Sequence, residues 1–156
     1  MIKEIAATLP APALAIIGEP TMMKTVTGHK GICVHEVEIL GHEAHSSLTH
    51  LGISANMIAI ELMHDLAELA RELWENSDPD SPFTPPHATL TIGKMEGGTA
   101  ANILARRSRF LFDLRCPPNV DPDKVLKPFK EKAAALDAQL KQAFPETGVR
   151  VEQLSN

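Results

Sequence analysis

Cysteine is scarce in this sequence, with only Cys33 and Cys116 among 156 residues. Two cysteines are too few for a disulfide scaffold, and both lie in strand-like runs, where a thiol packs as a small apolar group. The sequence also lacks the run of about 20 apolar residues that a membrane span needs. Its first residues contain no apolar core followed by a cleavage site. These absences predict a soluble, cytoplasmic protein without a membrane partner.

A strong excess of charge of either sign is also missing. The sequence has 15 Lys and Arg residues against 20 Asp and Glu residues, which gives a formal net charge of −5. Because binding to a phosphate backbone needs a clustered basic surface, we expect no nucleic-acid partner. The length is that of about one domain, and no internal repeat or low-complexity tract divides the chain.

The first residues differ in pattern from the rest of the chain. Residues 2–9 are typical of the end of a helix, which two prolines then stop. The apolar run 13–17 indicates a strand buried on both faces of a parallel sheet, but the chain supplies no obvious neighbouring strands for it. We therefore predict that 1–23 is a lead-in from another domain and that 24–156 is a domain of its own. The alternative is an unusual single domain.

From position 24 onward the apolar periodicity predicts strands and helices in a definite order. Four strands are predicted, over 32–40, 87–95, 109–115 and 149–152. One helix is predicted from Gly52 to Asn76, and a second opens with Asp121 as N-cap and Pro122 in its first turn. The order β-α-β-β-α-β predicts an α+β, ferredoxin-like fold, in which one four-stranded antiparallel sheet carries two helices on one face.

The predicted helix 52–76 has two apolar stripes. The first suits burial against a sheet and comprises Ala55, Ile58, Ala59, Leu62, Leu66, Leu69 and Leu73. The second lies on a neighbouring face and comprises Met57, Ile60, Met63, Ala67, Ala70 and Trp74. A sheet covers only one of these faces, and the strand 87–95 is expected at the sheet edge beside this helix, with unpaired backbone groups. We therefore predict a homodimer that forms through the helix 52–76 and the edge strand 87–95.

Four residues are candidates for chemistry: Glu19, His45, Asn102 and Arg115. Glu19 ends the apolar run 13–17, a position where α/β proteins hold ligands and metals, although a lone Glu-Pro-Thr is more often a turn. His45 lies on the connection between a strand and a helix, where side chains can meet ligands but a single histidine is more often solvated. Asn102 and Arg115 lie around the second hairpin.

Two other patterns near these residues could indicate ligand sites, but each has a simpler explanation. His42, His45 and His50 could suggest a metal cluster, but their spacing matches no strong zinc pattern. The glycine-rich segment 97–102 resembles a phosphate-binding loop only loosely, because it leads into a strand and not into a helix N-terminus. A flexible turn explains that segment by itself.

Five motifs in register are more specific than any one of them alone. They are Gly18-Glu19-Pro20-Thr21, Gly28-His29-Lys30-Gly31, Gly41-His42-Glu43-Ala44-His45-Ser46-Ser47 with Gly52-Ile53-Ser54-Ala55-Asn56, Gly97-Gly98-Thr99-Ala100-Ala101-Asn102-Ile103, and Phe112-Asp113-Leu114-Arg115. Through them the sequence resembles the metallopeptidase and deacylase family of acetylornithine deacetylase, succinyl-diaminopimelate desuccinylase, carboxypeptidase G and aminoacylase. The likeness is greatest to the acetylornithine deacetylase branch, and it covers nearly the whole chain.

The resemblance implies a two-domain enzyme, in which a ferredoxin-like domain that forms the homodimer interrupts a catalytic domain with two zinc ions, with cobalt as the alternative metal. This chain matches the inserted dimerisation domain with a short lead-in. The reaction implied is removal of the acyl group from a small N-acyl amino acid, as in arginine biosynthesis. Glu19 matches a zinc ligand, and His45 matches the histidine that reaches across the dimer to polarise the scissile carbonyl. Asn102 and Arg115 match positions that contact the carboxylate end of the substrate.

The sequence also departs from the family pattern. It contains no His-x-Asp and no Glu-Glu, the pairs that hold other metal ligands and the general base in the family. We therefore expect this chain alone to be inactive and to bind zinc weakly, if at all. The alternative function is that of a stand-alone ferredoxin-like interaction module without catalysis.

Overall fold

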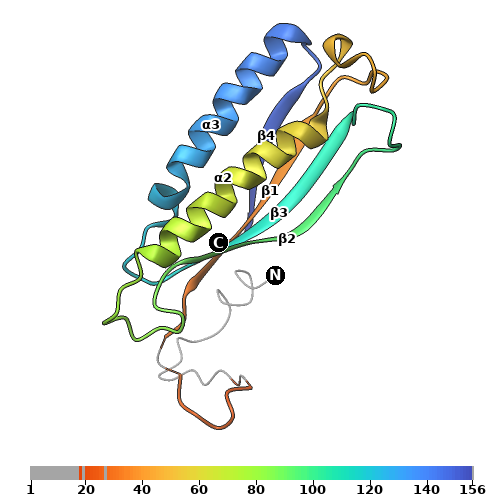
Figure 1. The fold of residues 1–156 in the computed structure, drawn as a ribbon. Helices are drawn as coiled ribbons and strands as arrows, with labels where there is room; N and C mark the ends of the chain where they lie inside the picture. The colour runs from red at the N-terminus through yellow and green to blue at the C-terminus, as the bar shows by residue number, and fades with distance from the viewer. Residues whose placement is uncertain (1–17, 19, 27, 156) are drawn as a thin grey trace, which may run out of the picture.

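The computed structural model describes residues 18, 20–26 and 28–155. The predicted helix end 2–9, the predicted strand 13–17 and Glu19 lie outside these residues. The described chain folds into the elements labelled in Figure 1. They are β1 (Gly31–Leu40), η1 (Thr49–Leu51), α2 (Ala55–Glu75), β2 (Thr89–Gly97), β3 (Arg107–Cys116), α3 (Pro122–Ala143) and β4 (Gly148–Ser155).

The four strands form one antiparallel sheet in the order β2-β3-β1-β4. Both helices lie on the same face of this sheet, with α2 beside β2 and β3 and α3 beside β4 (Figure 1). The predicted ferredoxin-like α+β fold is therefore confirmed, and so is the edge position of the second strand. Neither α2 nor α3 is apolar enough over its length to cross a membrane, and the described residues form no other long helix.

The core lies between the sheet and the two helices. In β1 the alternation predicted from the sequence is confirmed, because Val37 and Ile39 are buried on the helix side while Glu36 and Glu38 are partly exposed on the open side. The two aromatic rings Phe112 and Phe129 meet edge to face, with ring centroids 5.5 Å apart. The first stripe of α2 contributes four fully buried residues: Ala55, Ala59, Leu62 and Leu66.

The second strand differs from its prediction at both ends. β2 begins at Thr89 and continues to Gly97, with a shift of register between Ile92 and Lys94. The extra residue at this shift is Gly93, so the apolar residues Ile92 and Met95 are three apart and still pair with the buried residues of β3. Both predicted limits lie two residues too early, because residues 87–88 continue the alternation without pairing to β3, whereas Glu96 and Gly97 pair with β3 beyond Met95.

The N-terminus of α3 follows the sequence closely. The side chain of Asp121 accepts a hydrogen bond of 3.0 Å from the backbone N–H of Asp123, and Pro122 is the first helical residue. This arrangement confirms the predicted cap.

Candidate functional site

The loop that carries His45 connects β1 to α2 and is closed at its base. His42 and Ile53 exchange two backbone hydrogen bonds of 2.9 Å, which form an antiparallel bridge across the loop. Gly41 sits inside this closure: a Cβ atom there would collide with the carbonyl oxygen of Ile53 and lie 2.8 Å from that of Ala105. The loop therefore requires glycine at position 41 for the close approach of three backbone segments.

A second loop, between β2 and β3, is joined to the first by backbone hydrogen bonds. The N–H of Ser46 donates to the carbonyl of Asn102 at 2.9 Å, and the N–H of Leu104 donates to the carbonyl of Ala44 at 2.8 Å. His45 itself forms a bridge with Ile103. The structure thus places His45 beside Asn102, two candidate residues that the sequence could not relate in space. Both side chains are exposed, as expected for His45.

The imidazole of His45 is held in a defined tautomer. Its Nδ1 lies 3.2 Å from the backbone nitrogen of Ser47 and 2.8 Å from the hydroxyl oxygen of the same residue. A backbone N–H can only donate, so Nδ1 of the neutral ring is the acceptor and the proton resides on Nε2. The exposed ring can therefore donate a hydrogen bond through Nε2 to a ligand.

His42 has a positioning role that sequence reasoning missed. Its Nδ1 lies 2.6 Å from Oε1 of Glu146, 104 residues away in the sequence, and its ring stacks on Phe144 with centroids 4.1 Å apart. The pKa of Glu146 is lowered, first by a hydrogen bond from its own backbone and then by His42. These contacts fasten the His45 loop to the connection between α3 and β4. Within the described residues no three His, Cys, Asp or Glu side chains come together as a metal site.

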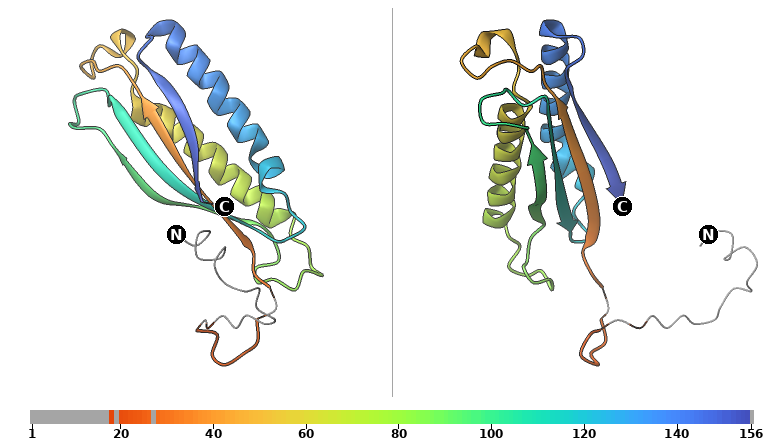
Figure 2. Two further views of the ribbon diagram at one scale, coloured as in Figure 1. Left: turned by 180° about the vertical axis from the view of Figure 1, so that it is seen from behind. Right: turned by 90° about the vertical axis from the view of Figure 1, so that its right-hand side faces the viewer.

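Arg115 lies at the other end of the sheet. It pairs with Ile32 at the start of β1, whereas Leu40 at the end of β1 leads into the His45 loop. At about 3.3 Å per residue, these two ends of β1 are about 26 Å apart. The Nε of Arg115 donates to Oδ2 of Asp113 at 2.8 Å. Figure 2 shows the two loops together at one end of the sheet, away from the end where β1 begins.

The second apolar stripe of α2 is largely uncovered. Met57 and Trp74 are each 64% exposed and Ile60 is 53% exposed, while Met63 and Ala70 are half-buried. On the adjacent edge strand β2, Met95 is 65% exposed. We refer to Met57, Ile60, Ala67, Trp74 and Met95 as the apolar face. Because it runs along a helix and continues onto a free sheet edge, it has the form of a protein–protein interface.

Replacing Gly41 by alanine is expected to disturb the His45 loop and to destabilise the fold by about 1–3 kcal/mol, since the new methyl group meets fixed backbone atoms. Urea unfolding and the amide spectra of residues 42–54 measure both effects. The matched control is Gly28→Ala, because nothing lies within 4 Å of a Cβ atom at Gly28. Equal stability of the two variants would contradict the role assigned to Gly41.

Residues 27–141 match the model of the peptidase dimerisation domain of the M20 family. This chain therefore belongs to the M20 peptidase dimerisation domain family, which confirms the resemblance drawn from its motifs.

Two curated relatives that this chain resembles are both acetylornithine deacetylases. The chain is 33% identical over 142 residues to an acetylornithine deacetylase of Myxococcus xanthus, a match that covers 86% of this chain and 37% of the relative. It is also 33% identical over 138 residues to an acetylornithine deacetylase of Photorhabdus laumondii, which covers 81% of this chain and 34% of the relative. The chain thus spans about a third of the length of these relatives.

Solved structures share the fold at lower identity. An amidase of the hydantoinase/carbamoylase family from Burkholderia vietnamiensis has a TM-score of 0.56 at 19% identity, over 81% of this chain and 28% of that chain. Aminopeptidase PepT from Bacillus cereus has a TM-score of 0.53 at 20% identity, over 81% of this chain and 31% of that chain.

Proposed function

We propose that this chain is the dimerisation domain of a zinc-dependent amidohydrolase that removes the acyl group from an N-acyl amino acid, with N-acetylornithine as the first substrate to test. The identities to acetylornithine deacetylases support this choice of substrate. A role in arginine biosynthesis and a cytoplasmic location belong to the same proposal. The single observation that carries a catalytic role is the exposed His45, fixed beside Asn102 with its proton on Nε2.

The proposed role of His45 is that of an oxyanion donor. When a nucleophile attacks an amide carbonyl, negative charge develops on the carbonyl oxygen, and a positioned N–H stabilises that charge. His45 would supply this N–H from Nε2, because Ser47 occupies Nδ1. Asn102 would contact the carboxylate end of the substrate from the neighbouring loop.

Zinc does not fit the residues that the structure describes. No group of three possible ligands occurs among them. The metal ligands, including the predicted ligand Glu19, and the general base must therefore come from outside the described residues. The domain's own contribution is to orient the substrate and to stabilise the oxyanion.

The homodimer completes this proposal. Within one protomer, Arg115 is about 26 Å from the end of the sheet that carries His45 and Asn102. One small substrate cannot span that distance. We infer that each active site takes His45 and Asn102 from one protomer and Arg115 from its partner, through a dimer built on the apolar face and the edge of β2.

Mixing inactive variants of the full-length enzyme tests this arrangement. After random reassociation, an equal mixture of His45→Ala and Arg115→Ala is expected to recover about a quarter of wild-type activity, because about half of the dimers are mixed and each has one intact site. A mixture of His45→Ala and Asn102→Ala is the matched control. It should recover nothing, because both residues come from the same protomer at each site. Recovery in neither mixture would contradict a shared site.

The rival function is a stand-alone interaction module. It predicts the same dimer but no effect of His45 on any hydrolysis. Metal content and N-acetylornithine hydrolysis, measured on this chain and on the full-length protein side by side, separate the two functions. The enzyme proposal requires activity in the full-length protein and none in the 156-residue chain.

A further inference from the structure

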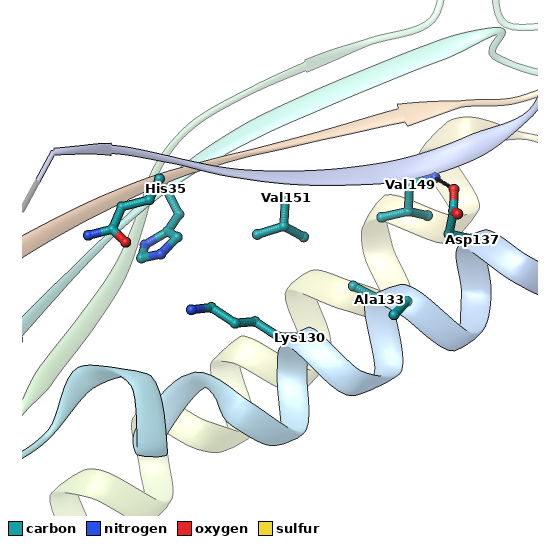
Figure 3. A pocket seen from close by; sticks show the side chains of 8 residues that line it. His35, Lys130, Ala133, Asp137, Val149 and Val151 are labelled. Carbon is teal, nitrogen blue, oxygen red and sulfur yellow. Dashed lines mark hydrogen bonds between the residues drawn. The ribbon is translucent and has the colours of Figure 1, made fainter.

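A groove of about 500 Å³ runs between α3 and the strands β1 and β4, and no residue of the loops that carry His45 and Asn102 lines it. Its lining is polar at both ends and apolar in the middle. Figure 3 shows His35 and Lys130 toward one end, Val151 and Ala133 between, and Asp137 beyond them beside Val149. This order of side chains has no part in the proposed hydrolysis.

His35 is the unusual residue of the groove. It lies on the buried face of β1, is 3% exposed, and stacks on Phe112 with ring centroids 5.0 Å apart. Neither of its ring nitrogens has a hydrogen-bond partner within the part of the chain that the structure describes. Burial, and then the charge of Lys130, lower the pKa of His35, although the Cys33 backbone, as a hydrogen-bond acceptor, and the charge of Asp123 partly oppose this. The neutral ring has one N–H donor, and no group of the described residues accepts from it within ordinary hydrogen-bond geometry.

The charges on either side of the apolar middle have opposite sign and spare bonding capacity. The ammonium of Lys130 donates to Asp123 at 2.7 Å and retains two further hydrogens. The carboxylate of Asp137 accepts from the N–H of Val149 at 2.9 Å and from Lys141 at 2.7 Å. A carboxylate has about four acceptor sites, so about two remain.

The strand register gives the distance between the two ends. His35 pairs with Gln153, and Val149, which binds Asp137, lies four residues back along β4. Four residues of strand measure about 13 Å. The side chains that reach in from both ends, together with two hydrogen bonds of about 2.8 Å each, shorten this span for a ligand. An extended chain of about four methylene groups with a charged group at each end is therefore the length to test first.

We propose that this groove binds a linear ω-amino carboxylate, with its carboxylate on Lys130 and His35, its methylene groups along Val151 and Ala133, and its ammonium on Asp137. Such a ligand accepts from the N–H of His35 and adds a further partner to Lys130 and to Asp137, each of which has one ion-pair partner in the chain. The proposal does not depend on the hydrolase assignment.

Titration of the 156-residue chain with 5-aminopentanoate, followed by the imidazole signals of His35 and the amide signals of Val149 and Val151, tests this site. We expect saturable shifts at these residues. Pentanoate and pentylamine each lack one charged group and should bind about tenfold more weakly or worse. 3-Aminopropanoate, which is too short to reach both ends of the groove, should also bind about tenfold more weakly or worse.

Two variants locate the binding. Lys130→Met should weaken binding of 5-aminopentanoate by about tenfold or more, while the matched control Lys127→Met, exposed on the same helix, should leave it unchanged. His35→Phe keeps the stack on Phe112 and should also weaken binding. If this variant does not fold, the comparison of 5-aminopentanoate with pentanoate, pentylamine and 3-aminopropanoate still tests the site. Absence of saturable shifts, equal binding of pentanoate, or unchanged binding in Lys130→Met would overturn the proposal.

Discussion

Replacing Ile60 by aspartate is expected to convert the proposed homodimer of this domain into a monomer. Ile60 lies near the middle of the apolar face and is 53% exposed in the single chain, so the substitution has little effect on the fold of the monomer. In a two-fold dimer the new carboxylate is buried twice without a partner. An uncompensated buried charge costs about 3–5 kcal/mol, so the dimer Kd should rise by a factor of about 10² to 10³ or more.

Sedimentation at micromolar concentration measures this change directly. Glu72→Gln is the matched control, because Glu72 is exposed on the same helix but on a different side from Ile60. This control should sediment as the wild-type dimer. A wild-type monomer at micromolar concentration, or an Ile60→Asp variant that remains dimeric, would show that the apolar face has been assigned wrongly.

The edge of β2 offers the proposed dimer a second contact. β2 pairs only with β3, so the backbone groups on its other side have no strand partner in the described chain. Two such edges related by a two-fold axis could pair and join two four-stranded sheets into one of eight strands. Such pairing would bring two α2 helices together over the junction. The apolar face and the free edge therefore favour the same two-fold axis.

The element order and the buried faces could be predicted because each depends on local periodicity. The alternation in β1 and β3 and the first stripe of α2 each lie within a short stretch of sequence. Where the local period breaks, the prediction was less accurate. Both limits of β2 were predicted two residues too early, because pairing with β3 and not apolar alternation sets them, and the short η1 carries no periodic signal at all.

The candidate site was only partly accessible from the sequence, because it depends on pairing between distant segments. Asn102 and Arg115 are close in sequence, but an extended strand, β3, separates them in space. The pair of His42 with Glu146 spans 104 residues, and no pattern in either segment indicates it. The motifs supplied the candidate residues, whereas the register of the sheet showed which of these candidates lie together.

If the full-length protein is the proposed deacetylase, replacing His45 by alanine is expected to lower kcat for N-acetylornithine hydrolysis by about 10²-fold or more, the effect of losing one oxyanion donor. The fold should be unaffected, because the side chain is exposed and bonds only within its own loop. His45→Gln, which keeps an N–H donor at this position, should lose less activity than alanine. His50→Ala, at an exposed histidine in η1 of the same loop, is the matched control and should keep full activity.

The pattern across these three variants distinguishes an oxyanion donor from a merely structural residue. A structural role predicts lower thermal stability in His45→Ala and no advantage of glutamine over alanine. Stabilisation of the oxyanion predicts unchanged thermal stability and a lower kcat in His45→Ala, and partial retention of kcat in His45→Gln. The reason is that the charge that His45 meets develops only in the transition state. Full activity in His45→Ala, or unfolding of that variant, would remove His45 from the mechanism and leave the domain with dimerisation alone.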